Sequence, residues 1–559
     1  DAFEQEHAVQ YFYEPFLEAY DPELRKQLGV WYTPPEVVRY MVKRVDRVLR
    51  DELDIQDGLA DDRVYVLDPC CGTGAYLVAA LDEIRDTLET KGTDDLIASD
   101  LKAAAQDRIF GFELLPAPYV VSHLQLGLYL QDQGISLAET ERVGVYLTNS
   151  LTGWVPPTEE RQKLMWTELE EERDAAERVK QETPILVIIG NPPYNGYAGV
   201  AMAEERELSD SYRETKKAPK PQGQGLNDLY VRFYRMAERH IVENNGKGIV
   251  CYISNYSWLD GLSFTGMRER YLEEFDRLWI DCLNGDKYKT GKLTPWGDPD
   301  PSIFSTEFNR EGIQVGTAIA LLARQPEHDS GATVRFRHLW GQRKRQELLE
   351  TATQDGQSPY ELIEPPVEIG YPFKPAQVAE DYLLWPSLPD LMPTCFPGVK
   401  TSRDDLVVDI DRERLVQRMQ EYFDPDISHE EMRRICPRAM NSTANFDAVA
   451  VREKLKEKGF ESGEIVRFCY RPFDIRWIYW VSETNLLDRE RADYFKHVRE
   501  SNPWFCAGKR DRPERGSQVV FTTELAEHHI GTPNINMFPL RVYAVPGQRN
   551  LVDPPLSED

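Results

Sequence analysis

The sequence predicts an α/β protein with a mainly parallel sheet covered by helices, followed by a C-terminal α+β domain. Short apolar stretches alternate with helical patterns after residue 60, which is typical of a parallel sheet. At 559 residues the chain is too long for one domain, and prolines gather between residues 365 and 389. We therefore expect a helical region at 1–60, an α/β domain at 61–330, a junction at 331–394 and a second domain at 395–559.

The composition excludes several classes of protein. Hydrophobic residues make up 41% of the chain and aromatic residues 11%, which is typical of folded rather than disordered proteins. No stretch approaches the ~18 apolar residues of a membrane span, and the first residues lack a secretory signal, so we expect a cytoplasmic protein. The eight cysteines form no Cys-x-x-Cys pair, and no two histidines have metal-ligand spacing. We expect reduced thiols and no metal site.

The negative charge is unevenly distributed. The 66 basic and 95 acidic residues give a formal charge of −29. Residues 391–559 hold 25 basic and 28 acidic residues, which leaves −26 for the first 390. This acidity argues against non-specific binding to nucleic acid but is compatible with a local basic cleft. The asymmetry indicates that the two parts have different partners.

The first 60 residues contain two helical patterns. Apolar residues recur at helical spacing through Tyr11–Tyr20 and through Val37–Leu49. The intervening Tyr32-Thr33-Pro34-Pro35 sequence places prolines where a helix begins, with Thr33 as its N-cap.

The first predicted strand, at residues 64–67, ends in a glycine-containing turn. Asp68-Pro69-Cys70-Cys71-Gly72-Thr73-Gly74 joins this strand to a helix at 75–88, and both glycines allow close approach of a ligand to the backbone. Glu113 follows another strand and can accept from both hydroxyls of a ribose. A third glycine at dinucleotide spacing is missing, which disfavours NAD. Further strands are expected at Ile109–Phe112, Gly144–Leu147, Ile185–Ile189, Gly248–Ile253 and Leu278–Cys282.

The apolar run Ile185–Ile189 ends in Gly190 and Asn191-Pro192-Pro193-Tyr194. Such strand ends carry the ligand sites of open α/β sheets. The prolines stiffen the backbone and remove N–H donors, so carbonyls and the Asn191 side-chain oxygen remain as acceptors for an exocyclic amine. Tyr194 offers a flat face for stacking on a planar ring.

Together, these motifs resemble those of the S-adenosylmethionine-dependent amino-methyltransferases of DNA, especially the N6-adenine class. The order Tyr-Thr-Pro, Asp-Pro-x-Cys-Gly-Thr-Gly, Asn-Pro-Pro-Tyr resembles the methyltransferase and target-recognition portion of Type ISP restriction–modification enzymes. Similar stretches are found in the second domain at Gly398–Asp409 and at Tyr470–Tyr479. The resemblance implies a Rossmann-like methyltransferase domain and a C-terminal target recognition domain.

The resemblance also assigns roles to individual residues. S-adenosylmethionine is expected to contact Tyr32, Thr33, Asp68, Gly72, Gly74, Glu113 and Asn149. Asn191 and Pro192 accept from the target amine and Tyr194 stacks on the base. Phe264 corresponds to a second aromatic clamp, for which a buried core phenylalanine is the alternative interpretation. The chain has Asn149 where the family usually has Asp, and Cys70 where it prefers Ala.

The implied reaction is methyl transfer to N6 of an adenine flipped out of double-stranded DNA. The resemblance implies phage defence, with nuclease and helicase domains in the same longer polypeptide or in a separate subunit. Residues 285–293 only superficially resemble a P-loop, and we interpret them as a surface loop. N4-cytosine methylation, protein-glutamine methylation and a catalytically idle DNA-specificity module remain alternatives.

Overall fold

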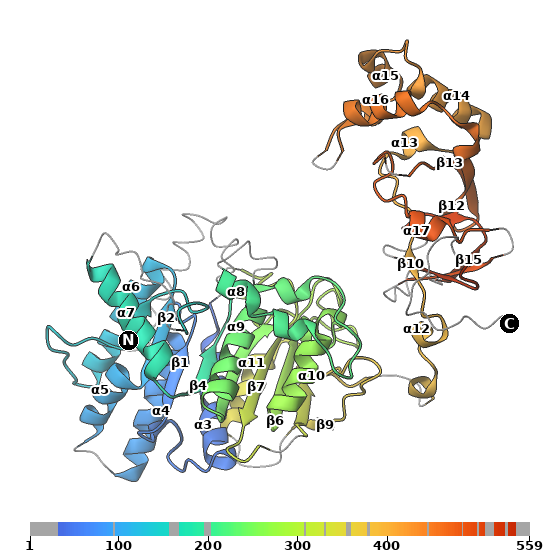
Figure 1. The fold of residues 1–559 in the computed structure, drawn as a ribbon. Coiled ribbons are helices and arrows are strands. Elements are labelled where there is room, and N and C mark those ends of the chain that lie inside the picture. The colour runs from blue at the N-terminus through green and yellow to red at the C-terminus, as the bar shows by residue number, and fades with distance from the viewer. Residues whose placement is uncertain are drawn as a thin grey trace. The chain divides into compact units, whose positions relative to one another are not determined.

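The computed structural model forms two compact units, residues 1–378 and 379–559 (Figure 1). It describes residues 32–92, 96–155, 167–194, 203–306, 309–328, 331–353, 359–376, 381–443, 446–482, 484–499, 502–508, 519–530 and 535–543. The helix predicted at Tyr11–Tyr20 therefore lies outside the described residues. Within these ranges, no helix is long and apolar enough to cross a membrane.

Unit 1 contains a sheet with the strand order β3-β2-β1-β4-β5-β7-β6-β8-β9. The first five strands in this order are parallel. β7 runs antiparallel between β5 and β6, β8 is parallel to β6, and β9 is antiparallel to β8. The predicted mainly parallel sheet is confirmed. The strands are β1 (Tyr65–Asp68), β2 (Ile109–Glu113), β3 (Val145–Leu147), β4 (Ile185–Gly190), β5 (Gly248–Asn255), β6 (Arg277–Asn284), β7 (Thr317–Arg324), β8 (Thr333–His338) and β9 (Glu361–Ile363).

Helices cover both faces of this sheet (Figure 1). Neighbouring residues point to opposite faces, so Val66 joins one hydrophobic cluster and Leu67 the other. This two-sided burial explains why the strands are continuously apolar rather than alternating. The helices of unit 1 are α3 (Pro35–Glu52), α4 (Ala75–Lys91), α5 (Ile97–Asp107), α6 (Pro116–Asp132), α7 (Thr167–Glu182), α8 (Ala203–Glu207), α9 (Leu229–Glu238), α10 (Thr265–Glu274) and α11 (Lys344–Thr353).

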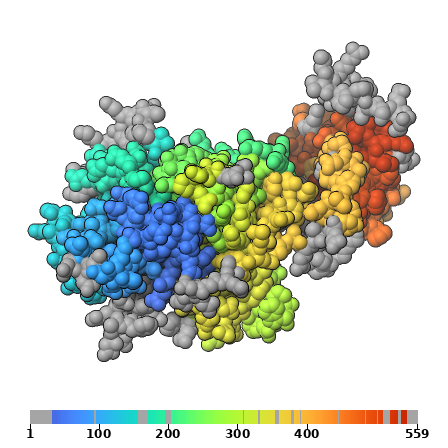
Figure 2. Space-filling view, turned by 90° about the horizontal axis from the view of Figure 1, so that it is seen from below, coloured from blue at the N-terminus to red at the C-terminus, as the bar shows by residue number. Residues whose placement is uncertain are grey.

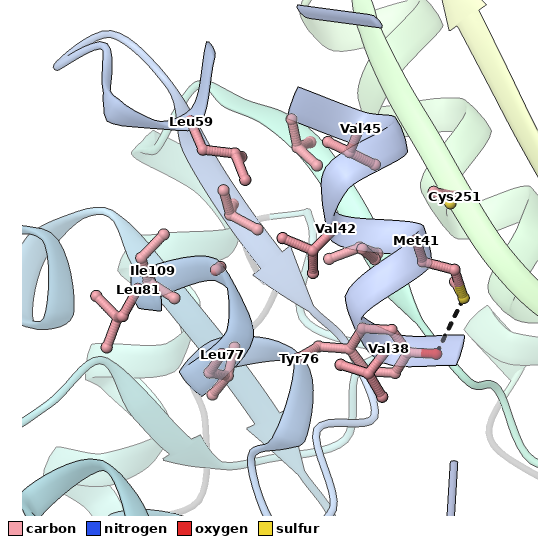
Figure 3. Close-up of a cluster of buried hydrophobic side chains, with 14 of the residues drawn as sticks. Val38, Met41, Val42, Val45, Leu59, Tyr76, Leu77, Leu81, Ile109 and Cys251 are labelled. Atoms are coloured by element: carbon pink, nitrogen blue, oxygen red, sulfur yellow. Dashed lines mark hydrogen bonds between the residues drawn. The ribbon is translucent and has the colours of Figure 1, made fainter. Parts of the chain in front are cut away.

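Helix α3 is an integral part of this core. It begins with Pro35 in its first turn and buries Val38, Met41, Val42 and Val45, which share one helical face. These side chains pack against α4, as Figure 3 shows. Each fully buried aliphatic side chain contributes about 1.5–3 kcal/mol. In the space-filling view of Figure 2, the blue N-terminal part of unit 1 directly contacts its green and yellow parts.

The observed boundaries differ from the predicted ones on both sides of the α/β domain. α3 belongs to the core of unit 1 rather than to a separate helical region at 1–60. β8, α11 and β9 fall within the predicted junction at 331–394, yet both strands pair in the large sheet. The proline-rich stretch begins only after β9, so the junction starts later than the predicted residue 331.

Unit 2 is the expected α+β domain and contains two four-stranded sheets. One has the order β10-β17-β14-β15 and the other β11-β13-β12-β16. Trp480 and Trp504 lie in its core. The strands are β10 (Phe396–Pro397), β11 (Val408–Asp409), β12 (Ile465–Arg471), β13 (Asp474–Tyr479), β14 (Trp504–Gly508), β15 (Val519–Thr522), β16 (Leu525–Ala526) and β17 (Ile535–Pro539). The helices are α12 (Leu388–Leu391), α13 (Asp404–Val407), α14 (Arg412–Phe423), α15 (His429–Ile435), α16 (Ala448–Lys458) and α17 (Ala492–Phe495).

Candidate active site

Three predicted site residues lie at the carboxyl ends of adjacent strands. Asp68 ends β1, Glu113 ends β2 and Asn191 directly follows β4. β1 pairs in parallel with both of the other strands, so the three ends meet at one edge of the sheet. This edge is where ligands bind in open α/β sheets.

The glycine turn after β1 is fixed to the end of β2 by Glu113. One carboxylate oxygen accepts from the Gly72 N–H at 2.9 Å, and the other accepts from the Leu114 and Leu115 N–H groups. Gly72 and Gly74 have φ angles of +55° and +90°, a region that favours glycine. Burial raises the pKa of Glu113, although the three N–H donors oppose this. Its predicted role in ribose binding remains a prediction.

Asp68 is a fully buried carboxyl at the centre of this edge. Its Oδ1 accepts from the Cys70 N–H at 3.0 Å, while Oδ2 has no hydrogen-bond partner among the described residues. A Cβ atom on Gly190 would lie 2.6 Å from Oδ1, so only glycine fits there. Burial, with a smaller contribution from Glu113, raises the pKa of Asp68 from 3.8 to about 7.

The raised pKa of Asp68 predicts a pH-dependent free energy of unfolding. The folded state keeps the proton between pH 3.8 and about 7, whereas the unfolded state releases it. The cofactor-free protein should therefore lose stability as the pH rises through this interval. Asp68→Asn should flatten this decline because an amide does not ionise. Urea unfolding of both proteins at several pH values measures the difference, and parallel curves would contradict the prediction.

The Asn-Pro-Pro-Tyr segment contacts the Tyr-Thr-Pro motif directly. Asn191 Nδ2 donates to Thr33 Oγ1 at 3.0 Å, across a separation of 158 residues. Thr33 and Pro192 are buried, and Tyr32 immediately precedes Thr33. Two motifs that the sequence analysis singled out separately are therefore parts of one site.

Tyr194 packs against an aromatic residue that the sequence analysis missed. The rings of Tyr194 and Phe304 meet edge to face, with centroids 6.1 Å apart. Phe304 lies in the loop between β6 and β7. Because β6 runs in the same direction as β4, this loop begins at the same edge of the sheet. Burial raises the pKa of Tyr194, whose hydroxyl has no hydrogen-bond partner within the described part of the chain.

Asn149 and Phe264 have other contacts in this structure. Asn149 Nδ2 donates to Glu205 at 2.7 Å, and its Oδ1 accepts from the Leu151 N–H at 2.9 Å. Phe264 is 3% exposed and packs near Tyr230 in the hydrophobic core. This position fits the alternative interpretation of Phe264 as a core residue. The cofactor role of Asn149 and the clamp role of Phe264 remain predictions.

The P-loop-like residues 285–293 form part of the exposed loop after β6. Asp286 accepts from the Tyr288 and Lys289 N–H groups, so a carboxylate occupies the amides that would cradle a phosphate. Tyr288 is 73% exposed. The interpretation of this segment as a surface loop is confirmed.

Family comparisons agree with the two-unit organisation. Residues 4–251 match the N-6 DNA methylase family, and residues 390–555 match the Type ISP C-terminal specificity domain. The chain therefore combines a segment that matches N-6 DNA methylases with a segment that matches the Type ISP specificity domain. The expected resemblance is thereby confirmed, and it covers the segments that contain Thr33, Asp68, Glu113 and Asn191.

Solved structures with similar folds include restriction–modification enzymes. The ATP-dependent Type ISP enzyme LlaBIII bound to DNA has a TM-score of 0.65 and 19% identity, covering 99% of this chain and 36% of its own. A nuclease-deletion mutant of the Type ISP enzyme LlaGI in complex with a DNA substrate mimic has a TM-score of 0.62 and 20% identity. The match covers 94% of this chain and 43% of the LlaGI chain. The DrdV–DNA complex has a TM-score of 0.61 and 22% identity. The match covers 98% of this chain and 52% of the DrdV chain.

A curated relative is similar to only part of this chain. The methylase subunit of the Type I restriction enzyme EcoEI from Escherichia coli is 29% identical over 126 residues. The match covers 22% of this chain and 21% of the relative. The chain thus spans about half or less of the length of these similar proteins.

Proposed function

We propose that this chain is a site-specific DNA methyltransferase that methylates N6 of adenine within a restriction–modification system for phage defence. The observation that carries the proposal is the Asn191–Thr33 hydrogen bond. It brings the amine-binding motif to the edge of the sheet where the glycine turn, Asp68 and Glu113 also lie. The N-6 DNA methylase match supports the reaction, and the specificity-domain match supports a DNA partner.

The residues at this edge fit S-adenosylmethionine. Asp68 Oδ2 is buried and lacks a partner among the described residues, so it can accept from a polar ligand group. A Cβ at Gly72 would meet nothing within 4 Å, so the turn is open on that side. Tyr32, Thr33, Gly74, Glu113 and Asn149 are the remaining residues proposed to hold the cofactor. When bound, the cofactor supplies the methyl group on its sulfonium.

The proposed chemistry of the protein is orientation rather than general-base catalysis. The nitrogen lone pair of an adenine amine is delocalised into the ring, which makes the amine a weak nucleophile. The side-chain oxygen of Asn191 and the backbone carbonyl of Pro192 accept from the amine. These hydrogen bonds draw the amine hydrogens out of the ring plane and localise the lone pair on the nitrogen. Tyr194 holds the flipped base by stacking, so the amine and the methyl group are kept in line.

The deciding experiment identifies the methylated nucleoside. The purified chain is incubated with genomic DNA that lacks adenine methylation and with methyl-labelled cofactor, and the DNA is digested to nucleosides. We expect labelled N6-methyladenine with the wild type and none with Tyr194→Ala. Labelled N4-methylcytosine or protein-bound label would assign the related reactions instead. Unlabelled DNA would support an idle specificity module.

The proposed partners are duplex DNA and nuclease and helicase domains, in the same longer polypeptide or in a separate subunit. The structurally similar LlaBIII is described as ATP-dependent, and LlaGI as having a nuclease. The charge of −29 requires that DNA contacts come from local basic groups, so we expect binding to weaken steeply with salt.

A further inference from the structure

The β12–β13 hairpin of unit 2 ends in a turn that displays a phenylalanine. The strands pair antiparallel up to Arg471 and Asp474, which leaves Pro472 and Phe473 as the turn. Phe473 has φ +64° and a relative exposure of 105%. The ring therefore projects fully into solvent from a short, well-paired hairpin.

Folding alone does not account for a phenylalanine at this position. Pro472 has the fixed φ that suits the first central residue of a tight turn, and the following positive φ favours Gly or Asn. A bulky side chain there strains the backbone. The ring also buries no apolar surface in the isolated domain. Both costs indicate that Phe473 contacts something outside the chain.

The residues beside the turn present guanidinium groups in fixed positions. The Tyr470 ring lies between Arg471 and Arg476, whose guanidinium carbons are 4.2 and 4.0 Å from its centroid. The Tyr470 hydroxyl donates to Asp404 at 2.7 Å, which holds the ring in place. Arg476 also pairs with Asp474 at 2.7 Å.

A second aromatic ring on the same hairpin has the same arrangement. Trp477 lies between Arg412 and Arg467, at 5.7 and 5.2 Å from its centroid. The side chain of Arg467 is 47% exposed, and its nearest carboxylate oxygen, on Glu524, is 4.0 Å away. An exposed ion pair of this kind contributes little stability, so Arg467 can exchange its partner for a phosphate at small cost. Arg471 is instead held at 2.9 Å by Glu527, whose side chain is buried.

We propose that the β12–β13 hairpin enters a groove of duplex DNA, where the Phe473 ring contacts the bases as a wedge. Arg467 and Arg476 contact phosphates of the same duplex. The chemistry favours DNA over a protein partner, because one isolated ring on a hairpin that carries several arginines is not an apolar docking patch. This inference rests on the proposed function, since it names the DNA contact of the specificity domain.

The test compares Phe473 with another exposed phenylalanine of unit 2. Wild-type methylation of genomic DNA first identifies the target sequence, and a labelled duplex carrying it is titrated with the full chain. Phe473→Gly should weaken binding about tenfold or more. The matched control Phe521→Ala, at a ring that is 71% exposed on β15, should bind like the wild type. The melting temperature of Phe473→Gly should equal or exceed that of the wild type, because glycine suits the positive φ.

Crosslinking provides a readout that does not depend on an unchanged fold. Benzoylphenylalanine incorporated at position 473 should photocrosslink to the duplex, and the same group at position 521 should not. Suppose that the wild type methylates DNA. The inference would then be overturned if Phe473→Gly bound the duplex as tightly as the wild type, or if the group at position 473 crosslinked only to protein. A wild type that neither binds nor methylates DNA would instead overturn the proposed function together with the inference.

Discussion

Replacing Asn191 with alanine is expected to lower the rate of methyl transfer at least about a hundredfold. The variant loses the side-chain acceptor for the target amine and the 3.0 Å hydrogen bond to Thr33. Cofactor affinity should change little, because Asp68 and Glu113 belong to β1 and β2 and Gly72 to the turn between β1 and α4. Single-turnover methylation and calorimetric titration with S-adenosylhomocysteine separate these two effects.

Thr33 provides a graded control for the same contact. Thr33→Val removes the acceptor for Asn191 Nδ2 but leaves the asparagine in place, so the loss of rate should be smaller than with Asn191→Ala. Thr33→Ser keeps the hydroxyl and should retain most of the activity. Equal activities for these two variants would show that the hydrogen bond does not position Asn191. Full activity of Asn191→Ala would overturn its assignment to the reaction.

The local motifs predicted much of the site because each lies at the end of a strand with a strong apolar pattern. Asp68, Glu113 and Asn191 follow β1, β2 and β4, and parallel pairing is enough to bring such ends together. The contact between Thr33 and Asn191 required only that both motifs reach this edge. The local sequence was therefore enough to predict which of these residues meet at this edge of the sheet.

Residues that depend on long-range pairing were harder to predict. Phe304 reaches Tyr194 because β7 inserts antiparallel between β5 and β6, which directs the loop after β6 to the site. No periodicity within the loop indicates this. The short strand β9 has little apolar pattern of its own, so only its pairing with β8 reveals that the sheet continues to Ile363.

A buried ion pair holds the loop that carries Phe304. Asp300 is fully buried and contacts Lys344 Nζ at 2.8 Å. Its oxygens also accept from the N–H groups of Gly285 and Gly341, both at 2.7 Å. Lys344 donates further to two backbone carbonyls, and its burial lowers the pKa of the ammonium group. The start of the loop is thus tied to α11 through one carboxylate.

Asp300→Ala is therefore expected to lower the free energy of unfolding by about 3–5 kcal/mol. It leaves a buried ammonium without its counter-ion and two backbone N–H groups without their acceptor. Urea unfolding measures the loss, and the Asp300→Ala/Lys344→Met double variant should recover part of it because no isolated charge remains buried. A loss below about 1 kcal/mol would place this pair among ordinary surface contacts. Since Phe304 lies only a few residues from Asp300, methylation by the folded fraction of Asp300→Ala should also fall.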